Sequence, residues 1–356
     1  MERGSVARNA ADGARVTADY DVLLVGELLV ELSAPTPLRD ARRFELSFSG
    51  DTLNAAAAAA AGGARVGVIA AVGDDELGEA LLAHLKERDI DTSLIRLVNR
   101  PNGLYLLGAD PVGAREFVYL RRESAGSLLR PADVDSDAVR AARALVVTGV
   151  ACAISDTAAA AVHHAAKLMR QQGRLVIYDP NFRRKLMTPR AARDVFAAMA
   201  TLSTIVKPSW PNDSQALFGK ADPAQAAAAA RQAGAAIALV TLGKQGALVD
   251  DGSSVVHYPP IPAPAAVDAT GSGDTLAGML AARLALGDDL APALRIAMTA
   301  AALSLSGQGG TGRVASLAEI RAHLGRTDRS LAQSGSEHAA HLPSSHRGHD
   351  QEANPQ

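Results

Sequence analysis

The sequence predicts an α/β fold in which a mostly parallel central sheet is covered by helices on both faces. Short runs of β-branched and other apolar residues alternate with alanine-rich stretches along the chain. This alternation is typical of parallel strands joined by helical crossovers. The chain has 356 residues, of which 48% are hydrophobic, so it can bury a large core.

The expected elements follow from composition and length. Strands are expected at the apolar runs Asp21–Leu32, Val66–Val72, Ala144–Thr148, Arg174–Tyr178, Thr204–Lys207 and Ile237–Thr241. Helices are expected at the stretches rich in helix formers, which are Thr52–Ala61, Glu76–Arg88, Thr157–Gln172, Ala191–Leu202, Ala224–Gly234, Thr275–Leu286 and Ala291–Ser306. The run of alanines at Ala55–Ala61 belongs to a helix in this interpretation, because alanine is the strongest helix former.

One region breaks the alternation. Two runs of β-formers in Gly103–Arg121 flank the sequence Asp110-Pro111-Val112-Gly113, which is typical of a hairpin turn. Together with Phe44–Phe48 these runs predict a small antiparallel sheet separate from the main one. A small sheet of this kind commonly acts as a lid over a ligand. Its edge could pair with a second subunit, since exposed strand edges invite pairing.

The two ends differ from the middle. Residues 1–18 and 327–356 are polar and poor in apolar side chains, so we expect disordered tails there. One structured domain is expected over residues 19–326, with the lid at about 34–48 and 101–123. The C-terminal histidines His338, His341, His346 and His349 are irregularly spaced in a polar segment, which favours a solvated tail over a metal site.

Charge and composition exclude several classes of protein. A formal net charge of -2 gives no electrostatic basis for binding nucleic acid. No apolar run reaches the roughly 18 to 20 residues that cross a bilayer, and the first twenty residues lack the apolar stretch of a secretion signal. The single cysteine, Cys152, can form no internal disulfide. These features predict a cytoplasmic protein.

The segment Val267–Gly278 carries the strongest chemical signal. Gly271, Ser272 and Gly273 form a loop of small residues whose backbone N–H groups can face an anion. A helix expected to begin near Asp274 adds the positive end of its dipole, a suitable place for a phosphoryl group. The same dipole favours the ionised carboxylate of Asp274, which could accept a proton from a hydroxyl. The alternative is that Asp274 only caps the helix.

Two other nucleotide sites fit poorly. The phosphate-binding pattern GxxxxGK[ST] is absent from the chain. The run Gly271–Gly278 is not GxGxxG, and no strand leads directly into it with an acidic residue about 20 positions later. A P-loop and a Rossmann dinucleotide site are therefore not predicted.

The segment Asp268–Gly278 resembles the C-terminal signature of the PfkB, or ribokinase-like, carbohydrate kinases. Three further segments resemble the family in the same order along residues 20–326. They are the sugar-binding turn Ser49–Asn54, the run Ala71–Gly78 and the nucleotide loop Thr241–Gly246. The resemblance implies a ribokinase-like three-layer fold, the cofactors ATP and Mg²⁺, Asp274 as the catalytic base, and nucleotide contacts from Thr241, Gly243 and Gly246.

Within the family, the chain is most similar to the kinases of the sugar acid 2-dehydro-3-deoxygluconate. The similar segments are Gly50–Asn54, Asp91–Ile95, Gly103–Leu107, Glu116–Leu129 and Asp179–Met187. The resemblance implies that the substrate is bound by Gly50, Asn54, Tyr105, Tyr119, Arg121 and Arg183. Two features support this independently. Tyr119 and Arg121 are two apart on a strand and share a face, and guanidinium groups suit a carboxylate. For each arginine, the alternative is a surface salt bridge.

The chain departs from the family pattern at Thr299, where the family often has an asparagine near the adenine, and at two further places that concern the sugar and the metal. Ser49 stands where the family has the first glycine of its sugar-binding pair, so the backbone could approach the sugar less closely there. The N-x-x-E motif for magnesium is absent from Lys207–Leu217, where Asn212 or Asp213 could replace the glutamate. The sequence does not decide between the two residues, so the metal ligand stays unassigned.

These observations favour phosphorylation of a sugar acid hydroxyl by ATP, with 2-dehydro-3-deoxy-D-gluconate as the leading substrate. Other sugar kinases of the family, such as a fructokinase, ribokinase or 5-dehydro-2-deoxygluconokinase, are the next alternatives. A catalytically silent ligand-binding protein would share the fold, but it would not require Asp274 beside an intact Gly271–Gly273 loop. A dehydrogenase is the remaining alternative.

Overall fold

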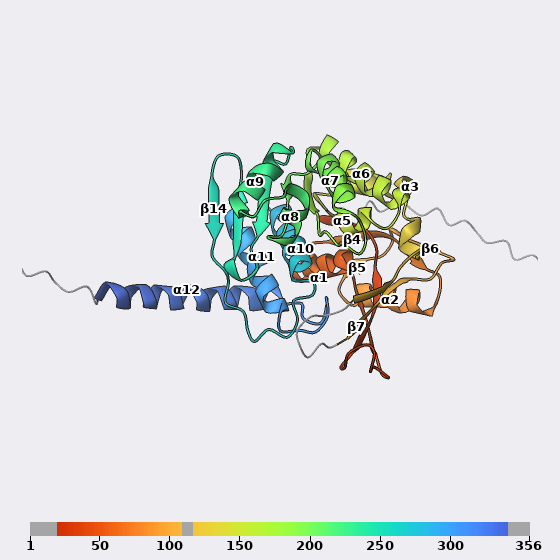
Figure 1. The fold of residues 1–356 in the computed structure, drawn as a ribbon, viewed down its shortest axis with the longest axis horizontal. Helices are drawn as coiled ribbons and strands as arrows, with labels where there is room; N and C mark the ends of the chain where they lie inside the picture. The colour runs from red at the N-terminus through yellow and green to blue at the C-terminus, as the bar shows by residue number, and fades with distance from the viewer. Residues whose placement is uncertain (1–19, 109–116, 341–356) are drawn as a thin grey trace, which may run out of the picture.

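The computed structural model describes residues 20–108 and 117–340, and these contain the predicted mostly parallel sheet between two layers of helices (Figure 1). The strands of the main sheet are β1 (Val22–Val25), β4 (Val66–Gly73), β5 (Ile90–Asp91), β6 (Ile95–Val98), β9 (Ala144–Thr148), β10 (Leu175–Asp179), β11 (Ile205–Val206), β12 (Ile237–Thr241), β13 (Ala247–Asp250) and β14 (Val255–Tyr258). Their order is β14-β13-β12-β11-β10-β9-β1-β4-β5, with β6 also paired to β4. The described pairings run parallel, except at the edge formed by β12, β13 and β14.

The two helical layers pack on opposite faces of the sheet. One layer consists of α1 (Asp51–Ala61), α2 (Glu76–Lys86), α10 (Ser272–Ala285), α11 (Leu290–Ser304) and α12 (Leu317–Ala340). The other consists of α3 (Pro131–Val134), α4 (Asp137–Ala141), α5 (Gly149–Cys152), α6 (Asp156–Gln171), α7 (Pro189–Ala200), α8 (Asn212–Phe218) and α9 (Pro223–Gln232). In β1, Val22 and Leu24 join the first core, and Leu23 and Val25 join the second. Strand residues that alternate between faces thus fill both cores.

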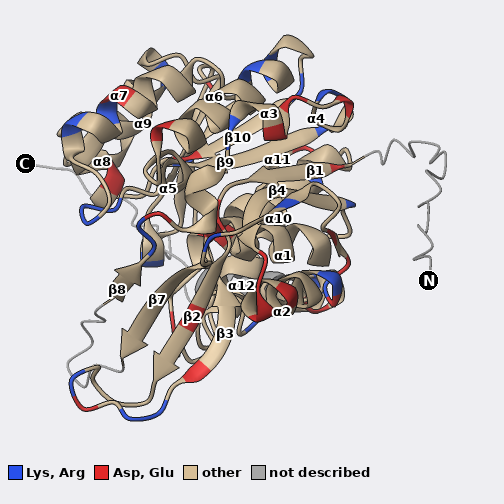
Figure 2. Ribbon diagram, turned by 90° about the vertical axis from the view of Figure 1, so that its right-hand side faces the viewer, with Lys and Arg blue, Asp and Glu red and all other residues tan. Residues whose placement is uncertain are grey.

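A second, four-stranded sheet extends from the body (Figure 2). Its strands are β2 (Leu29–Ala34), β3 (Glu45–Ser49), β7 (Gly103–Gly108) and β8 (Phe117–Leu120), in the order β3-β2-β7-β8. The hairpin pair β7–β8 is antiparallel as predicted. Strand β3 pairs antiparallel with β2 and not with the hairpin, and the central pair β2–β7 is parallel. The expected turn at residues 110–113 lies outside the described residues.

The sequence did not reveal that strand β2 of this small sheet is separate from strand β1 of the main sheet. Asp21–Leu32 was predicted as one strand, but the chain leaves the main sheet after Val25 and enters the small sheet at Leu29. Gly26 lies in the connection, where an added Cβ would be 2.2 Å from the hydroxyl oxygen of Thr52. The nearly continuous apolar run hides this change of sheet, because both strands are buried on both faces.

The described chain continues beyond residue 326, where the expected domain ends. Helix α12 continues to Ala340, past residue 327, where we expected a disordered tail to begin (Figure 1). Low apolar content disfavours packing, but the segment has alanine, leucine, glutamine and glutamate and no proline before Pro343, so its sequence is compatible with a helix. The expected tail at 1–18, and residues 341–356 of the tail expected at 327–356, lie outside the described residues. No helix in the described chain is both long and apolar enough to span a membrane.

Candidate active site

A cavity of about 850 Å³ lies where the carboxyl ends of the main-sheet strands meet the small sheet. Open α/β sheets bind ligands at this edge. The cavity brings together nearly all of the residues predicted from the sequence, which are Gly50, Asn54, Tyr105, Tyr119, Arg121, Arg183, Thr241, Gly243, Gly271, Ser272, Gly273 and Asp274. Gly246 is not among its lining residues. A Cβ at Gly246 would lie 2.1 Å from the Tyr258 carbonyl oxygen, so this glycine allows close packing against β14.

Asp274 lies in the first turn of α10, which begins at Ser272. Gly271 precedes the helix with φ 76°, and a Cβ there would lie 2.9 Å from the Gly310 carbonyl oxygen. Both the left-handed backbone and the close contact therefore require glycine at this position. The Nδ2 group of Asn54 donates a hydrogen bond of 2.9 Å to Oδ2 of Asp274. The sugar-binding turn and the predicted base thus meet directly.

This meeting depends on a close crossing of α1 and α10. A Cβ added at Gly278 would lie 1.9 Å from the carbonyl oxygen of Ala55, so the two helix backbones touch there. Ser49 completes the arrangement, because its hydroxyl donates to Oδ1 of Asn54 at 3.2 Å. The residue that departs from the family's glycine therefore orients Asn54, whose amide in turn orients the carboxylate of Asp274.

Burial sets the protonation behaviour of Asp274. Desolvation, followed by the nearby charges of Asp51 and Asp179, raises the pKa of Asp274 to about 6. The Asn54 hydrogen bond and the charge of Lys207 lower this pKa, but they do not compensate. We expected the helix dipole to favour the ionised form, and the structure shows that desolvation dominates instead. A carboxylate with a pKa near 6 is still ionised at neutral pH, and is more basic than an ordinary aspartate.

The loop before Asp274 is held by Asp268. One carboxylate oxygen of Asp268 accepts hydrogen bonds from the Thr270 N–H at 2.9 Å and the Thr270 hydroxyl at 2.8 Å. The other accepts the Gly309 N–H at 2.9 Å. These contacts fix the loop before any ligand arrives, which suits a group that must stabilise developing charge without reorganising.

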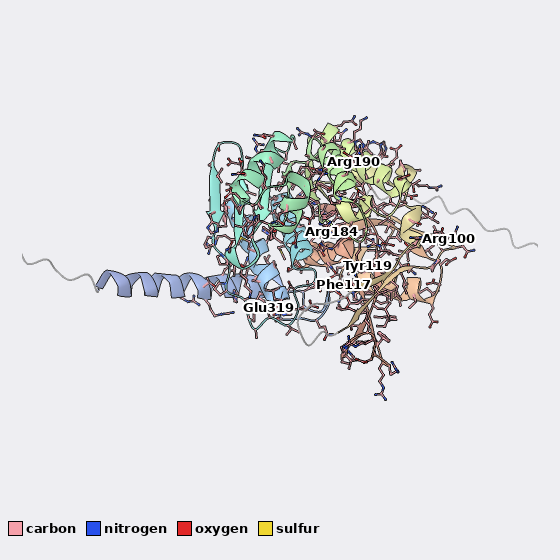
Figure 3. All side chains as sticks on the ribbon, in the orientation of Figure 1. Arg100, Phe117, Tyr119, Arg184, Arg190 and Glu319 are labelled. Carbon is pink, nitrogen blue, oxygen red and sulfur yellow. The ribbon has the colours of Figure 1, made fainter. Side chains whose placement is uncertain are left out.

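Aromatic rings from the small sheet form one wall of the cavity. Phe117 and Tyr119 are stacked with centroids 6.0 Å apart, and Tyr105 is tilted against Tyr119 at 6.2 Å. Figure 3 shows Phe117 and Tyr119 close to Arg184 where the small sheet meets the body. The Tyr105 hydroxyl donates to the buried carboxylate of Glu31, whose pKa is raised by burial. Tyr105 can therefore offer a ligand its ring and its hydroxyl oxygen.

The two predicted arginines lie in different settings. Arg121 is buried and forms an ion pair with Glu27, which also accepts a hydrogen bond from Ser124. Burial raises the pKa of Glu27 despite these partners. Arg183 is exposed on the loop after β10, and its guanidinium donates to the neighbouring Phe182 carbonyl at 3.3 Å. Arg121 is thus fixed in place, whereas Arg183 extends into the cavity on a solvent-accessible loop.

The predicted nucleotide loop lies at the end of β12. Thr241 is the last residue of that strand, and Gly243 begins the short 3₁₀ turn Gly243–Gln245. Gly243 has φ 57°, and nothing lies within 4 Å of the position its Cβ would occupy. The backbone is therefore open to the cavity at this residue.

The structure distinguishes between the two residues that could replace the glutamate of the absent N-x-x-E motif. Asn212 is exposed and lies outside the cavity lining, whereas Asp213 is buried and lines it. Oδ1 of Asp213 accepts the Phe182 N–H at 2.8 Å, and Oδ2 accepts the N–H and hydroxyl of Ser209 at 2.7 and 2.8 Å. Burial and the neighbouring Asp179 raise the pKa of Asp213. Within the described chain, no group of three His, Cys, Asp or Glu side chains is arranged to hold a metal directly.

Several charged groups of the cavity were not predicted. Asp51, Asp179 and Lys207 line it, and Glu27 lies behind it, paired with Arg121. Asp179 is the last residue of β10 and Lys207 directly follows β11. Their places at the carboxyl ends of two neighbouring parallel strands were the signal that could have identified them.

Comparison with known proteins agrees with this geometry. The profile of the pfkB family of carbohydrate kinases matches residues 19–315. A 2-dehydro-3-deoxygluconokinase from Thermoproteus tenax is 34% identical over 299 residues, which cover 82% of this chain and 90% of the relative. The crystal structure of a PfkB protein from Polaromonas sp. JS666 is 30% identical, with a TM-score of 0.76 over 85% of this chain and 99% of its own.

A third similarity concerns the fold alone. An Escherichia coli structure assigned as a ribokinase II, in complex with ATP and Mg²⁺, has a TM-score of 0.78 and 24% identity. It covers 86% of this chain and 99% of its own. The predicted ribokinase-like architecture is therefore confirmed.

Proposed function

This chain belongs to the pfkB family of carbohydrate kinases, and we propose that it transfers the γ-phosphoryl group of ATP to a hydroxyl of 2-dehydro-3-deoxy-D-gluconate, giving the 6-phosphate. The observation that best supports this proposal is the buried carboxylate of Asp274, which is hydrogen-bonded to Asn54 beside the Gly271–Gly273 loop. A base and an anion-binding loop at one point are what transfer to a hydroxyl requires. The 34% identical relative supports the choice of sugar acid.

In the proposed reaction, each part of the cavity has one role. Tyr105, Tyr119, Arg121, Arg183 and the Gly50 turn hold the sugar acid against the small sheet, which acts as a lid. Thr241 and Gly243 contact the nucleotide. The hydroxyl oxygen attacks the γ-phosphorus, its proton passes to Asp274, and the Gly271–Gly273 loop stabilises the charge on the phosphoryl oxygens.

We further propose that magnesium accompanies ATP. Magnesium prefers oxygen ligands and usually keeps several waters. Asp179 and Asp213 place carboxylates at the cavity, but three of their four oxygens are each in an ion pair or hydrogen bond to Lys207, Phe182 or Ser209, and the fourth accepts the Asn181 N–H. These residues therefore fit a hydrated ion better than a directly ligated one. When bound, the ion would neutralise phosphate charge.

The remaining parts of the proposal concern the whole chain. We place the catalytic domain at residues 19–326, in the cytoplasm. The outer face of the small sheet exposes Leu46, Val118 and Leu120, which supports a homo-oligomer assembled through this sheet. Size-exclusion chromatography with light scattering would test the assembly.

A panel of acceptors tests the function. The wild-type protein should consume ATP with 2-dehydro-3-deoxy-D-gluconate, and removal of magnesium should abolish turnover. Fructose, ribose and 5-dehydro-2-deoxygluconate test the alternatives within the family. A neutral sugar used equally well would replace the proposed substrate but leave the kinase assignment standing. Absence of ATP consumption with every acceptor would contradict both.

The pKa of Asp274 predicts the pH dependence of turnover. Because only the ionised carboxylate accepts a proton, kcat should be constant above about pH 7 and fall as the pH drops through about 6. An ordinary aspartate, with its pKa of about 3.9, would keep its activity to below pH 5. Steady-state kinetics between pH 5 and 8, with substrates saturating, measure this. A constant kcat down to pH 5 would show that the raised pKa does not control turnover.

Gly243 provides a test of the nucleotide loop. Gly243→Ala places a methyl group in the open space of the cavity and should raise the KM for ATP about threefold to tenfold, with kcat and the KM for the sugar acid little changed. Gly287→Ala is the matched control, because Gly287 also has positive φ with no atom within 4 Å of its Cβ position, and it lies outside the cavity lining. Equal effects of the two variants on ATP would remove Gly243 from the nucleotide site.

A further inference from the structure

A buried lysine lies in the cavity without a role in the reaction described so far. Lys207 directly follows β11, and its side chain is 3% exposed. Its ammonium forms an ion pair of 2.7 Å with Oδ2 of Asp179, a carboxylate that is 4% exposed. Removing an ammonium from water is unfavourable, so a buried lysine requires compensating partners. Asp179 supplies one, and the ammonium still reaches the cavity wall.

The ammonium lies next to the anion-binding loop. A Cβ added at Gly273 would be 3.4 Å from Nζ of Lys207, so the charge lies over the second glycine of that loop. The same ammonium is close enough to Asp274 to lower the pKa of that carboxyl. A cation therefore lies close to both the anion-binding loop and the base, and the phosphoryl group must lie near both during transfer.

We propose that Lys207 is a catalytic residue whose ammonium donates a hydrogen bond to an oxygen of the γ-phosphoryl group, with Asp179 holding the lysine in position. This rests on the proposed function. The hydroxyl oxygen forms a bond to the γ-phosphorus while the bond to the bridging oxygen of ADP breaks, and the hydroxyl proton passes to Asp274. Lys207 keeps its proton throughout and balances the negative charge on the phosphoryl oxygens.

A structural role is the competing explanation. In this explanation, the sole role of Lys207 is to neutralise Asp179 and Asp213, which lie together in the cavity wall. In that case its removal would disturb the local fold through an uncompensated carboxylate. Neutralising Asp179 at the same time would then repair the damage. A contact with the γ-phosphoryl group instead predicts a defect that remains after charge balance is restored.

The test measures nucleotide binding as well as turnover. Lys207→Met keeps the length of the side chain and removes its charge. We expect kcat to fall roughly 10²- to 10³-fold, as for loss of one preorganised donor. In calorimetry without sugar, the Kd for ATP should rise at least about tenfold while the Kd for ADP stays within about twofold, because ADP lacks the contacted group. Lys167→Met, an exposed lysine on α6 outside the cavity, is the matched control and should change neither.

The charge-balanced variant separates the two explanations. The double variant Lys207→Met/Asp179→Asn has no uncompensated carboxylate at this pair. If the single variant Lys207→Met does not fold, the double variant is used in its place. Our proposal predicts that the double variant keeps the low kcat and the selective loss of ATP affinity. Equal weakening of ATP and ADP binding in the double variant, or a Kd for ATP within about twofold of wild type, would overturn it. Because ATP and ADP binding need no sugar, this result is independent of whether the proposed acceptor is correct.

Discussion

Asp274→Asn should lower kcat by roughly 10²- to 10⁴-fold, the usual contribution of a general base. The substitution preserves shape, and the amide oxygen of the new side chain can still accept the hydrogen bond from Asn54. It removes only the ability to take up the hydroxyl proton. The Kd for ATP should stay near that of the wild type, because the Gly271–Gly273 loop and the start of α10 are unchanged. Steady-state kinetics and calorimetry on the same preparation measure both.

Thermal unfolding distinguishes loss of the base from loss of the fold. The pKa of Asp274 is higher in the folded protein, about 6, than its ordinary value of 3.8. The folded state therefore binds this proton more tightly, and the carboxyl costs stability as the pH rises through about 4 to 6. A neutral asparagine avoids this cost, so the variant should unfold at or above the wild-type Tm at pH 7.

Asp289→Asn is the matched control for this variant. It makes the same substitution at an exposed residue that precedes α11 and makes no side-chain capping bond, so turnover should not change. A near-normal kcat in Asp274→Asn would reduce Asp274 to a helix-terminal residue. A large fall in Tm would instead show that its carboxylate is needed for folding.

The main sheet was predictable because each of its strands is marked by a local run of apolar residues. Runs such as Ala144–Thr148 and Ile237–Thr241 are the strands β9 and β12 at the predicted residues, since buried parallel strands are short and continuously apolar. The passage from β1 to β2 was not predictable in this way. What separates them is the contact of Gly26 with Thr52, which belongs to a helix 26 residues further along the chain. Contacts of this kind leave no periodicity in the sequence.

The site shows the same division. Motif residues such as Asn54 and Asp274 were predicted, but their mutual hydrogen bond depends on the contact of Gly278 with Ala55. The rise in the pKa of Asp274 also depends on tertiary burial, which overrides the local helix dipole. Glu27 lies in an apolar run and gave no sign of its ion pair with Arg121. Pairing of buried charges is set by packing between distant segments, so spacing along the chain does not reveal it.

The preference for a sugar acid should depend on Arg183. A neutral sugar offers hydroxyls, whereas a 2-keto acid offers a carboxylate that accepts charge-assisted hydrogen bonds worth about 1.5 to 3 kcal/mol each. Arg183 suits this role because its guanidinium is exposed in the cavity and bonded only weakly to the adjacent Phe182 carbonyl, at 3.3 Å. Arg183→Ala should therefore lower kcat/KM for 2-dehydro-3-deoxy-D-gluconate roughly tenfold to hundredfold, with little change in the KM for ATP.

Arg121 gives a less direct test than Arg183 does. Its removal would leave the buried carboxylate of Glu27 without its cation, so a loss of activity in Arg121→Ala could reflect lost stability. The charge-balanced change, Arg121→Met with Glu27→Gln, tests substrate binding without that defect. If Arg121 also contacts the sugar acid, this double variant should keep most of the wild-type Tm and still lose affinity for it.

The comparison of Arg183 with Arg190 completes this test. Arg190 is exposed on α7 outside the cavity lining, so Arg190→Ala removes the same charge without touching the site. It should leave kcat/KM within about twofold of wild type, and Arg183→Lys should restore only part of the loss in Arg183→Ala, since lysine lacks the planar pair of donors. The decisive measurement is the ratio of kcat/KM for the sugar acid to that for fructose. A bound carboxylate predicts that Arg183→Ala lowers this ratio about tenfold or more, whereas an unchanged ratio would show that Arg183 does not recognise the acid.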